Sequence, residues 1–64
     1  MNTYAIREVW GSQGAPTLGY VTAASATRAV VAFLRSRGYD AREESNGDLI
    51  TSDDAPSLVA YKLR

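Results

Sequence analysis

Residues 25–39, SATRAVVAFLRSRGY, decide the fold, because both ends and the apolar face of this segment indicate a helix. Ser25 is a good N-cap, since its hydroxyl accepts a hydrogen bond from a first-turn N–H group that has no partner within the helix. Gly38 suits the C′ position, where the backbone turns left-handed, and Tyr39 would then contact Leu34 in a Schellman motif. The spacing between these caps predicts an apolar face made of Ala26, Ala29, Val30, Phe33 and Leu34.

Strand-like segments lie on both sides of this helix. The residue types of Thr3–Trp10 and Leu18–Ala23 predict two strands before it, joined by the loop Gly11–Thr17. Leu58–Leu63 predicts a last strand, in which the alternate residues Val59, Tyr61 and Leu63 share one face.

A hairpin is predicted between the helix and the last strand. The pair Asn46-Gly47 favours a type I′ turn, because that turn needs positive φ at both central residues. Such a turn joins Ala41–Ser45 to Asp48–Ser52, with Glu44 opposite Leu49 and Glu43 opposite Ile50.

This order of elements predicts a single small α+β domain over residues 1–64. We expect two layers: one antiparallel or mixed sheet of four to five strands (order ββαββ(β)), with a single helix packed across it. The expected core contains Tyr4, Ile6, Leu18, Tyr20, Val30, Phe33, Leu34, Leu49 or Ile50, Val59, Tyr61 and Leu63.

The residue types argue against an enzyme. The 64 residues include no cysteine and no histidine, which removes the usual zinc, redox and nucleophile–base chemistry, and neither a P-loop nor an EF-hand pattern occurs. Glu43-Glu44 and Asp53-Asp54 are neighbours in sequence, so in strands their side chains would point to opposite faces instead of forming a catalytic pair. We therefore expect no catalytic residues, no metal site and no cofactor.

The sequence also bears on location. It holds no apolar run of about 18 residues and no secretory pattern at residues 1–10, so we expect a cytoplasmic protein, in its own or a host cell, without membrane contact.

Charge is distributed unevenly along the chain, although the net charge is zero. Residues 40–54 hold six carboxylates and one arginine, a local net of −5, whereas residues 1–39 carry a net of +3. One dominant sign steers association with a surface of opposite sign. We therefore predict a non-enzymatic module that binds a protein with a basic surface, through Glu43, Glu44, Asp48, Asp53, Asp54 and Trp10.

Two alternatives stay open. A nucleic-acid-binding domain would use Arg7, Arg28 and Arg35, with Trp10, Tyr4 and Tyr20 stacking bases on the sheet. The zero net charge and a pI near 6.1 argue against it, since phosphate neutralisation dominates such affinity. The second alternative is a homodimeric structural subunit, because so small a core gains from oligomerisation.

In size and layout the chain resembles the compact αβ proteins that phages and mobile elements encode to inhibit host defence or regulatory machinery. The resemblance implies an inhibitor or regulator whose acidic hairpin occupies a nucleic-acid channel by imitating phosphate charge.

Overall fold

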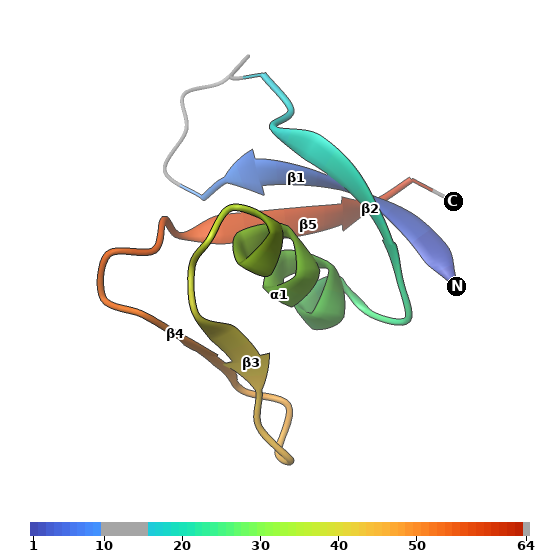
Figure 1. The fold of residues 1–64 in the computed structure, drawn as a ribbon. Coiled ribbons are helices and arrows are strands. Elements are labelled where there is room, and N and C mark those ends of the chain that lie inside the picture. The colour runs from blue at the N-terminus through green and yellow to red at the C-terminus, as the bar shows by residue number, and fades with distance from the viewer. Residues whose placement is uncertain (10–15, 64) are drawn as a thin grey trace.

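The computed structural model describes residues 1–9 and 16–63. This part of the chain is α+β, with one helix and two antiparallel sheets (Figure 1). None of its helices is long and apolar enough to cross a membrane. The elements follow in the order β1 (Asn2–Glu8), β2 (Gly19–Ala23), α1 (Ala26–Ser36), β3 (Ala41–Glu43), β4 (Leu49–Thr51) and β5 (Leu58–Lys62).

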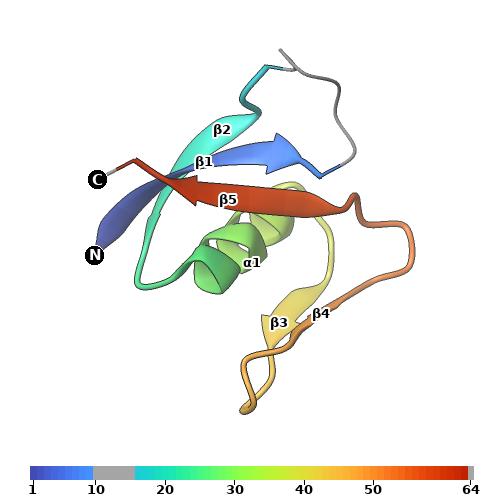
Figure 2. The same cartoon turned by 180° about the vertical axis from the view of Figure 1, so that it is seen from behind.

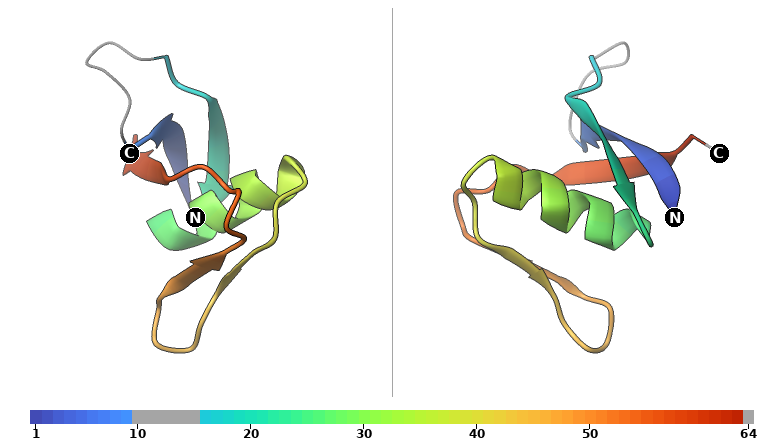
Figure 3. Two further views of the ribbon diagram at one scale, coloured as in Figure 1. Left: turned by 90° about the vertical axis from the view of Figure 1, so that its left-hand side faces the viewer. Right: turned by 45° about the vertical axis from the view of Figure 1, so that its right-hand side comes forward.

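The strands form two separate sheets. β1 is the central strand of a three-stranded sheet in the order β2-β1-β5, whereas β3 and β4 make a two-stranded hairpin. The predicted single sheet of four to five strands is therefore wrong. β3 and β4 have three residues each, and Ala41 is the one buried residue among them, so the hairpin offers little to pair with or to bury against the larger sheet. Helix α1 lies between the sheet and the hairpin (Figure 3).

Both predicted helix caps are confirmed. The Ser25 hydroxyl accepts a hydrogen bond from the Arg28 N–H at 3.2 Å. Gly38 has φ +88°, and its N–H donates to the Arg35 carbonyl at 3.1 Å. The Tyr39 N–H donates to the Leu34 carbonyl at 3.0 Å, which completes the Schellman motif. These caps fix where the chain enters and leaves α1.

The core lies between α1 and one face of the three-stranded sheet. Tyr4, Ile6, Val30, Phe33 and Leu34 are buried in it, as predicted. Ala26, which was expected on the apolar face of the helix, is exposed. Residues that the sequence did not indicate complete the core, namely Ala23, Ala41 and Leu58.

Large side chains of the helix meet small residues of the sheet. A Cβ atom added at Gly19 would lie 2.9 Å from Cε1 of Phe33, so the Phe33 ring occupies the place of a side chain on β2. Gly19 and Ala60 lie opposite Ile6 on the two outer strands, which leaves room for the helix to approach. The helix-facing surface of the outer strands is therefore made of small residues near Ile6.

Tyr20, Tyr61 and Leu63 lie on or beside the outer strands and face away from the helix, whereas Leu58 of β5 faces the core. With Leu18, they are the four predicted core members of these strands that are exposed. Tyr20, Tyr61, Leu63 and Leu18 expose 67%, 54%, 49% and 38% of their surface, and Val59 is half-buried. Tyr20 and Tyr61 both lie opposite Ala5, whose side chain points away from α1. The predicted grouping of Val59 with Tyr61 and Leu63 is consistent with this register, but the shared face is the outer one.

Leu18 departs from the strand pattern. Its N–H donates to the Ile6 carbonyl at 2.7 Å, one residue out of the β1–β2 register, which indicates a bulge at the start of β2. Leu18 thus lines a groove of 490 Å³ with Phe33 and Tyr39 instead of continuing the outer face of β2.

The hairpin turn differs from the predicted type I′ turn. Gly47 has φ +90°, but none of the described non-glycine residues, Asn46 included, has positive φ. The Gly47 N–H donates to the Glu44 carbonyl at 2.9 Å, and the Glu44 N–H donates to the Asp48 carbonyl at 2.8 Å. These bonds define a three-residue loop that ends in a left-handed glycine. The register therefore shifts by one residue, and Glu43, not Glu44, lies opposite Leu49.

Candidate functional site

The fold presents two candidate surfaces on opposite sides of the molecule. The first, called the acidic hairpin, is residues 40–54. The second, called the open sheet face, is the surface of the three-stranded sheet that α1 does not cover; Figure 2 shows it without any helix in front. The strand register places on this face Thr3, Ala5, Arg7, Tyr20, Thr22, Val59, Tyr61 and Leu63.

Two of the predicted site carboxylates are already paired within the chain. Glu43 Oε1 lies 3.2 Å from Nε of Arg28, which reaches across from the first turn of α1. Glu44 Oε1 lies 3.1 Å from an Nη atom of Arg42. All four side chains remain in contact with solvent, so these pairs lower the local charge without burying it.

The remaining charge of the acidic hairpin lies on aspartates. Asp48 follows the turn, where its N–H donates to Asn46 Oδ1 and its carboxylate accepts from Asn46 Nδ2, both at 3.0 Å. Asp40, Asp53 and Asp54 are exposed at the base of the hairpin, where the chain enters β3 and leaves β4. The structure thus places the charge at the tip and base of the hairpin, with the paired glutamates between.

Two apolar side chains interrupt this charged surface. Leu49 and Ile50, one of which was expected in the core, are 38% and 41% exposed on β4. Their exposure follows from the separation of the two sheets, because the hairpin lies beyond the helix and has no second layer of its own.

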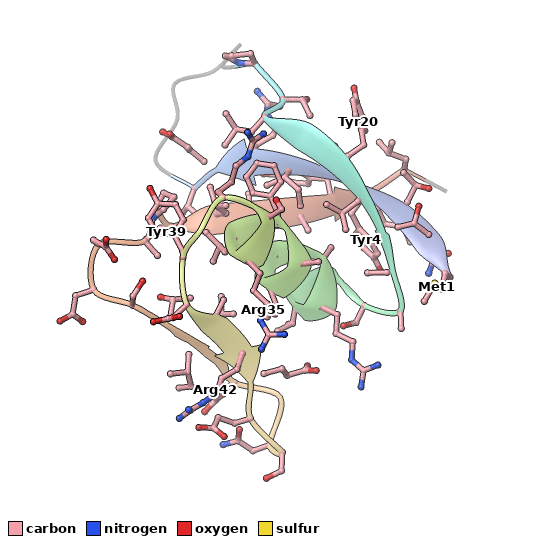
Figure 4. All side chains as sticks on the ribbon, in the orientation of Figure 1. Met1, Tyr4, Tyr20, Arg35, Tyr39 and Arg42 are labelled. Atoms are coloured by element: carbon pink, nitrogen blue, oxygen red, sulfur yellow. The ribbon has the colours of Figure 1, made fainter. Side chains whose placement is uncertain are left out.

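A groove of 440 Å³ separates the end of α1 from the hairpin, and Ile50 lines it together with Arg35, Tyr39 and Ser52. Arg35 Nε donates to the Ala41 carbonyl at 2.8 Å, and its side chain points from α1 toward β3 (Figure 4). The Ser52 hydroxyl is buried and has no partner among the described residues.

The residues of the nucleic-acid alternative are not brought together. Arg7 belongs to the open sheet face, whereas Arg28 and Arg35 project from α1 toward the hairpin, where each contacts a hairpin group. Tyr4 is buried against the helix, so it presents no ring for stacking. Trp10, a predicted anchor in both hypotheses, lies outside the described residues.

The sequence indicated the open sheet face only in part, since the nucleic-acid hypothesis placed Tyr20 on the sheet for base stacking, whereas Tyr61 and Leu63 were expected in the core. The side chains of this face form rows across the strands: Thr22, Thr3 and Leu63 in one row, then Tyr20, Ala5 and Tyr61 in the next. The Thr3 and Thr22 hydroxyls lie 3.3 Å apart. Figure 4 shows Tyr20 pointing away from α1 and Tyr4 lying toward it. One available signal was Ala5, whose small side chain is itself buried between two tyrosines.

The described residues offer little for metal chemistry, since among positions 1–9 and 16–63 no three acidic side chains gather as metal ligands would.

Comparisons with protein-family models, with curated proteins and with solved structures give no match.

Proposed function

We propose that the chain is a non-enzymatic module that binds a protein with a basic surface, and that the acidic hairpin makes the contact. The observation that carries this proposal is the hairpin itself, which stands apart from the main sheet and exposes Leu49 and Ile50 among carboxylates. Leu49 and Ile50 are neighbours on β4 and point to opposite faces of the hairpin, so either face offers a partner one apolar side chain among carboxylates.

Electrostatics supports a basic partner. After the pairing of Glu43 with Arg28, the hairpin region still carries an excess of exposed carboxylates at Asp40, Asp48, Asp53 and Asp54. A field of one sign raises association rates with an oppositely charged surface and is screened beyond about 8–10 Å at physiological salt. The hairpin is therefore suited to steer a partner, while Leu49 or Ile50, according to the face that the partner meets, supplies apolar contact.

The aspartates make the sharpest test. Reversing Glu43 or Glu44 would place a lysine beside Arg28 or Arg42, so that a folding defect and a binding defect would be confounded. Asp48→Asn, Asp53→Asn and Asp54→Asn remove charge without breaking an ion pair between residues that the structure describes. Each surface change should alter the free energy of unfolding by within about 0.5 kcal/mol.

The experiment identifies a partner by affinity capture from the source cell and then measures association kinetics at several salt concentrations. The triple aspartate variant should associate about tenfold more slowly at low salt, with a smaller change in dissociation rate. Asp54→Asn and Glu8→Gln form a matched pair, since each neutralises one exposed carboxylate and Glu8 lies outside the hairpin. Equal association rates for the wild type and the triple variant would refute the proposal.

A further inference from the structure

The open sheet face exposes several large apolar side chains to solvent. Tyr20 and Tyr61 flank Ala5, and Leu63 and Val59 lie beside Tyr61 along β5. Arg7 is the one charged side chain that the described register places on this face. A nearly uncharged sheet surface with large apolar side chains is typical of a surface that packs against another layer.

The pattern of this face is complementary to itself. Neighbouring strands are about 4.8 Å apart, so Tyr20 and Tyr61 stand about 9.6 Å apart with the small Ala5 between them. Consider two copies with their open sheet faces opposed, related by a two-fold axis that lies in the plane between the faces. If this axis runs across the strands, between the tyrosine row and the threonine–leucine row, each tyrosine row lies on the threonine–leucine row of the other copy. Tyr61 then contacts Leu63 of the second copy, and Tyr20 contacts its Thr22.

The same two-fold axis keeps the charged side chains out of the contact. Arg7 lies on the far side of the tyrosine row from Thr3, so the two Arg7 side chains fall at opposite ends of the paired faces. They remain at the solvent-exposed rim and far from each other. The acidic hairpin lies on the other side of α1, so its carboxylates stay clear of the contact (Figure 3). The chain's zero net charge adds no long-range repulsion between copies.

The area of the face sets the expected strength. At 67% and 54% exposure, the two tyrosines together present about 240 Å². With Leu63, Val59 and the threonines the face offers on the order of 500 Å² per copy, or about 1,000 Å² in total, which is the lower end for a specific interface. An interface of this size gives a weak dimer.

We propose that two copies of this chain stack their open sheet faces in a two-fold dimer, which buries Tyr20 and Tyr61 and leaves both acidic hairpins free. The result is a four-layer α-β-β-α arrangement. This inference concerns a surface separate from the one assigned to partner binding, so either proposal can fail without the other.

Analytical ultracentrifugation tests the dimer directly. The wild type should change from monomer to dimer between about 10 µM and about 1 mM, as expected of a dissociation constant in the high micromolar range. The variant Tyr20→Lys/Tyr61→Lys should dimerise about 100-fold more weakly, because it places four ammonium groups in the contact. Leu49→Lys/Ile50→Lys is the matched control, with the same charge change on exposed apolar positions of the hairpin, and it should dimerise as the wild type does.

Two checks distinguish a loss of dimerisation from unfolding of the variant and from charge-driven binding. Circular dichroism establishes that each variant is folded, and the single variant Tyr61→Lys, expected to weaken the dimer about tenfold, replaces the double variant if that one is unfolded. The dimer should persist at high salt, whereas binding through the acidic hairpin should weaken. A wild type that stays monomeric at about 1 mM, or one that binds a single-stranded oligonucleotide on this face as a monomer, would overturn the proposal.

Discussion

The acidic hairpin and the open sheet face use exposed surface in opposite ways. On the hairpin, charges dominate, both glutamates are paired with arginines, and the strands have three residues each. On the sheet face, tyrosines and aliphatic side chains dominate, and the strands have five to seven residues. In the two proposals, the hairpin attracts an unlike partner at long range, and the sheet face contacts a second copy at short range. Helix α1, which contacts both sheets, is what holds the two surfaces apart.

The largest expected effect tests that helix. Phe33→Ala should lower the free energy of unfolding by about 3–5 kcal/mol, because it removes the ring that fills the space above Gly19. Both regions should lose amide-exchange protection together, since they share α1 as their support. Leu49→Ala, at an exposed hairpin position, serves as the control and should cost under about 1 kcal/mol. A cost below about 1 kcal/mol for Phe33→Ala would show that this ring is not a core element.

Gly19→Ala tests why the bulky residues face outward. The added methyl group would meet the Phe33 ring at 2.9 Å, so we expect destabilisation by about 1–3 kcal/mol from overpacking. Chemical denaturation measures the effect, with Thr22→Ala on the outer face of the same strand as the control. If Gly19→Ala were neutral, the close approach of helix and sheet would not be what excludes large side chains from the inner face beside Ile6.

A pair of glycines separates the stability of the two regions. Gly38 and Gly47 have nearly the same φ, +88° and +90°, and an added Cβ would meet no atom within 4 Å at either position. Alanine should therefore cost about 1–2 kcal/mol of backbone strain at each. Gly38→Ala should lower global stability through the helix cap, whereas Gly47→Ala should raise amide exchange in the hairpin alone. Equal losses of global stability would show that the hairpin unfolds with the core.

The smallest expected effect concerns the ion pair that links helix and hairpin. A double-mutant cycle of Arg28→Ala and Glu43→Ala, read by thermal or chemical denaturation, should give a coupling of about 0.2–1 kcal/mol, because the pair is partly exposed. High salt should reduce this coupling. A coupling of zero would mean that Glu43 contributes its full charge to the binding surface.

Local features were the ones that sequence reasoning predicted well. Ser25, Gly38 and Tyr39 act through hydrogen bonds to residues close in the chain, so their side-chain chemistry was enough to place α1 and both of its caps. The Asn46-Gly47 pair also located the hairpin correctly. The predicted turn type was wrong, and the predicted strand register was off by one residue. Of the pair Asn46-Gly47 only Gly47 takes the left-handed conformation, and a three-residue loop results.

Features that depend on distant contacts were not predictable in the same way. The alternation of β5 separates two faces but does not say which one meets the helix. That choice depends on the Phe33 ring, which fits over Gly19 and leaves Tyr20 on the outside, and on the pairing of Ala5 with Tyr61. The candidate site was not predictable from the sequence for the same reason. The ion pair between Glu43 and Arg28 joins a residue of the protein-binding hypothesis to a residue of the nucleic-acid hypothesis.

The central claim, that the sheet face contacts a second copy while the hairpin does not, has a direct test in a concentration series of two-dimensional 1H–15N NMR spectra. Between about 20 µM and about 1 mM, amide resonances of Thr3, Ala5, Tyr20, Thr22 and Tyr61 should shift or broaden, in keeping with a weak dimer in exchange. Resonances of residues 42–50 should stay in place. Spectra that do not change with concentration, or changes confined to the hairpin, would contradict the account.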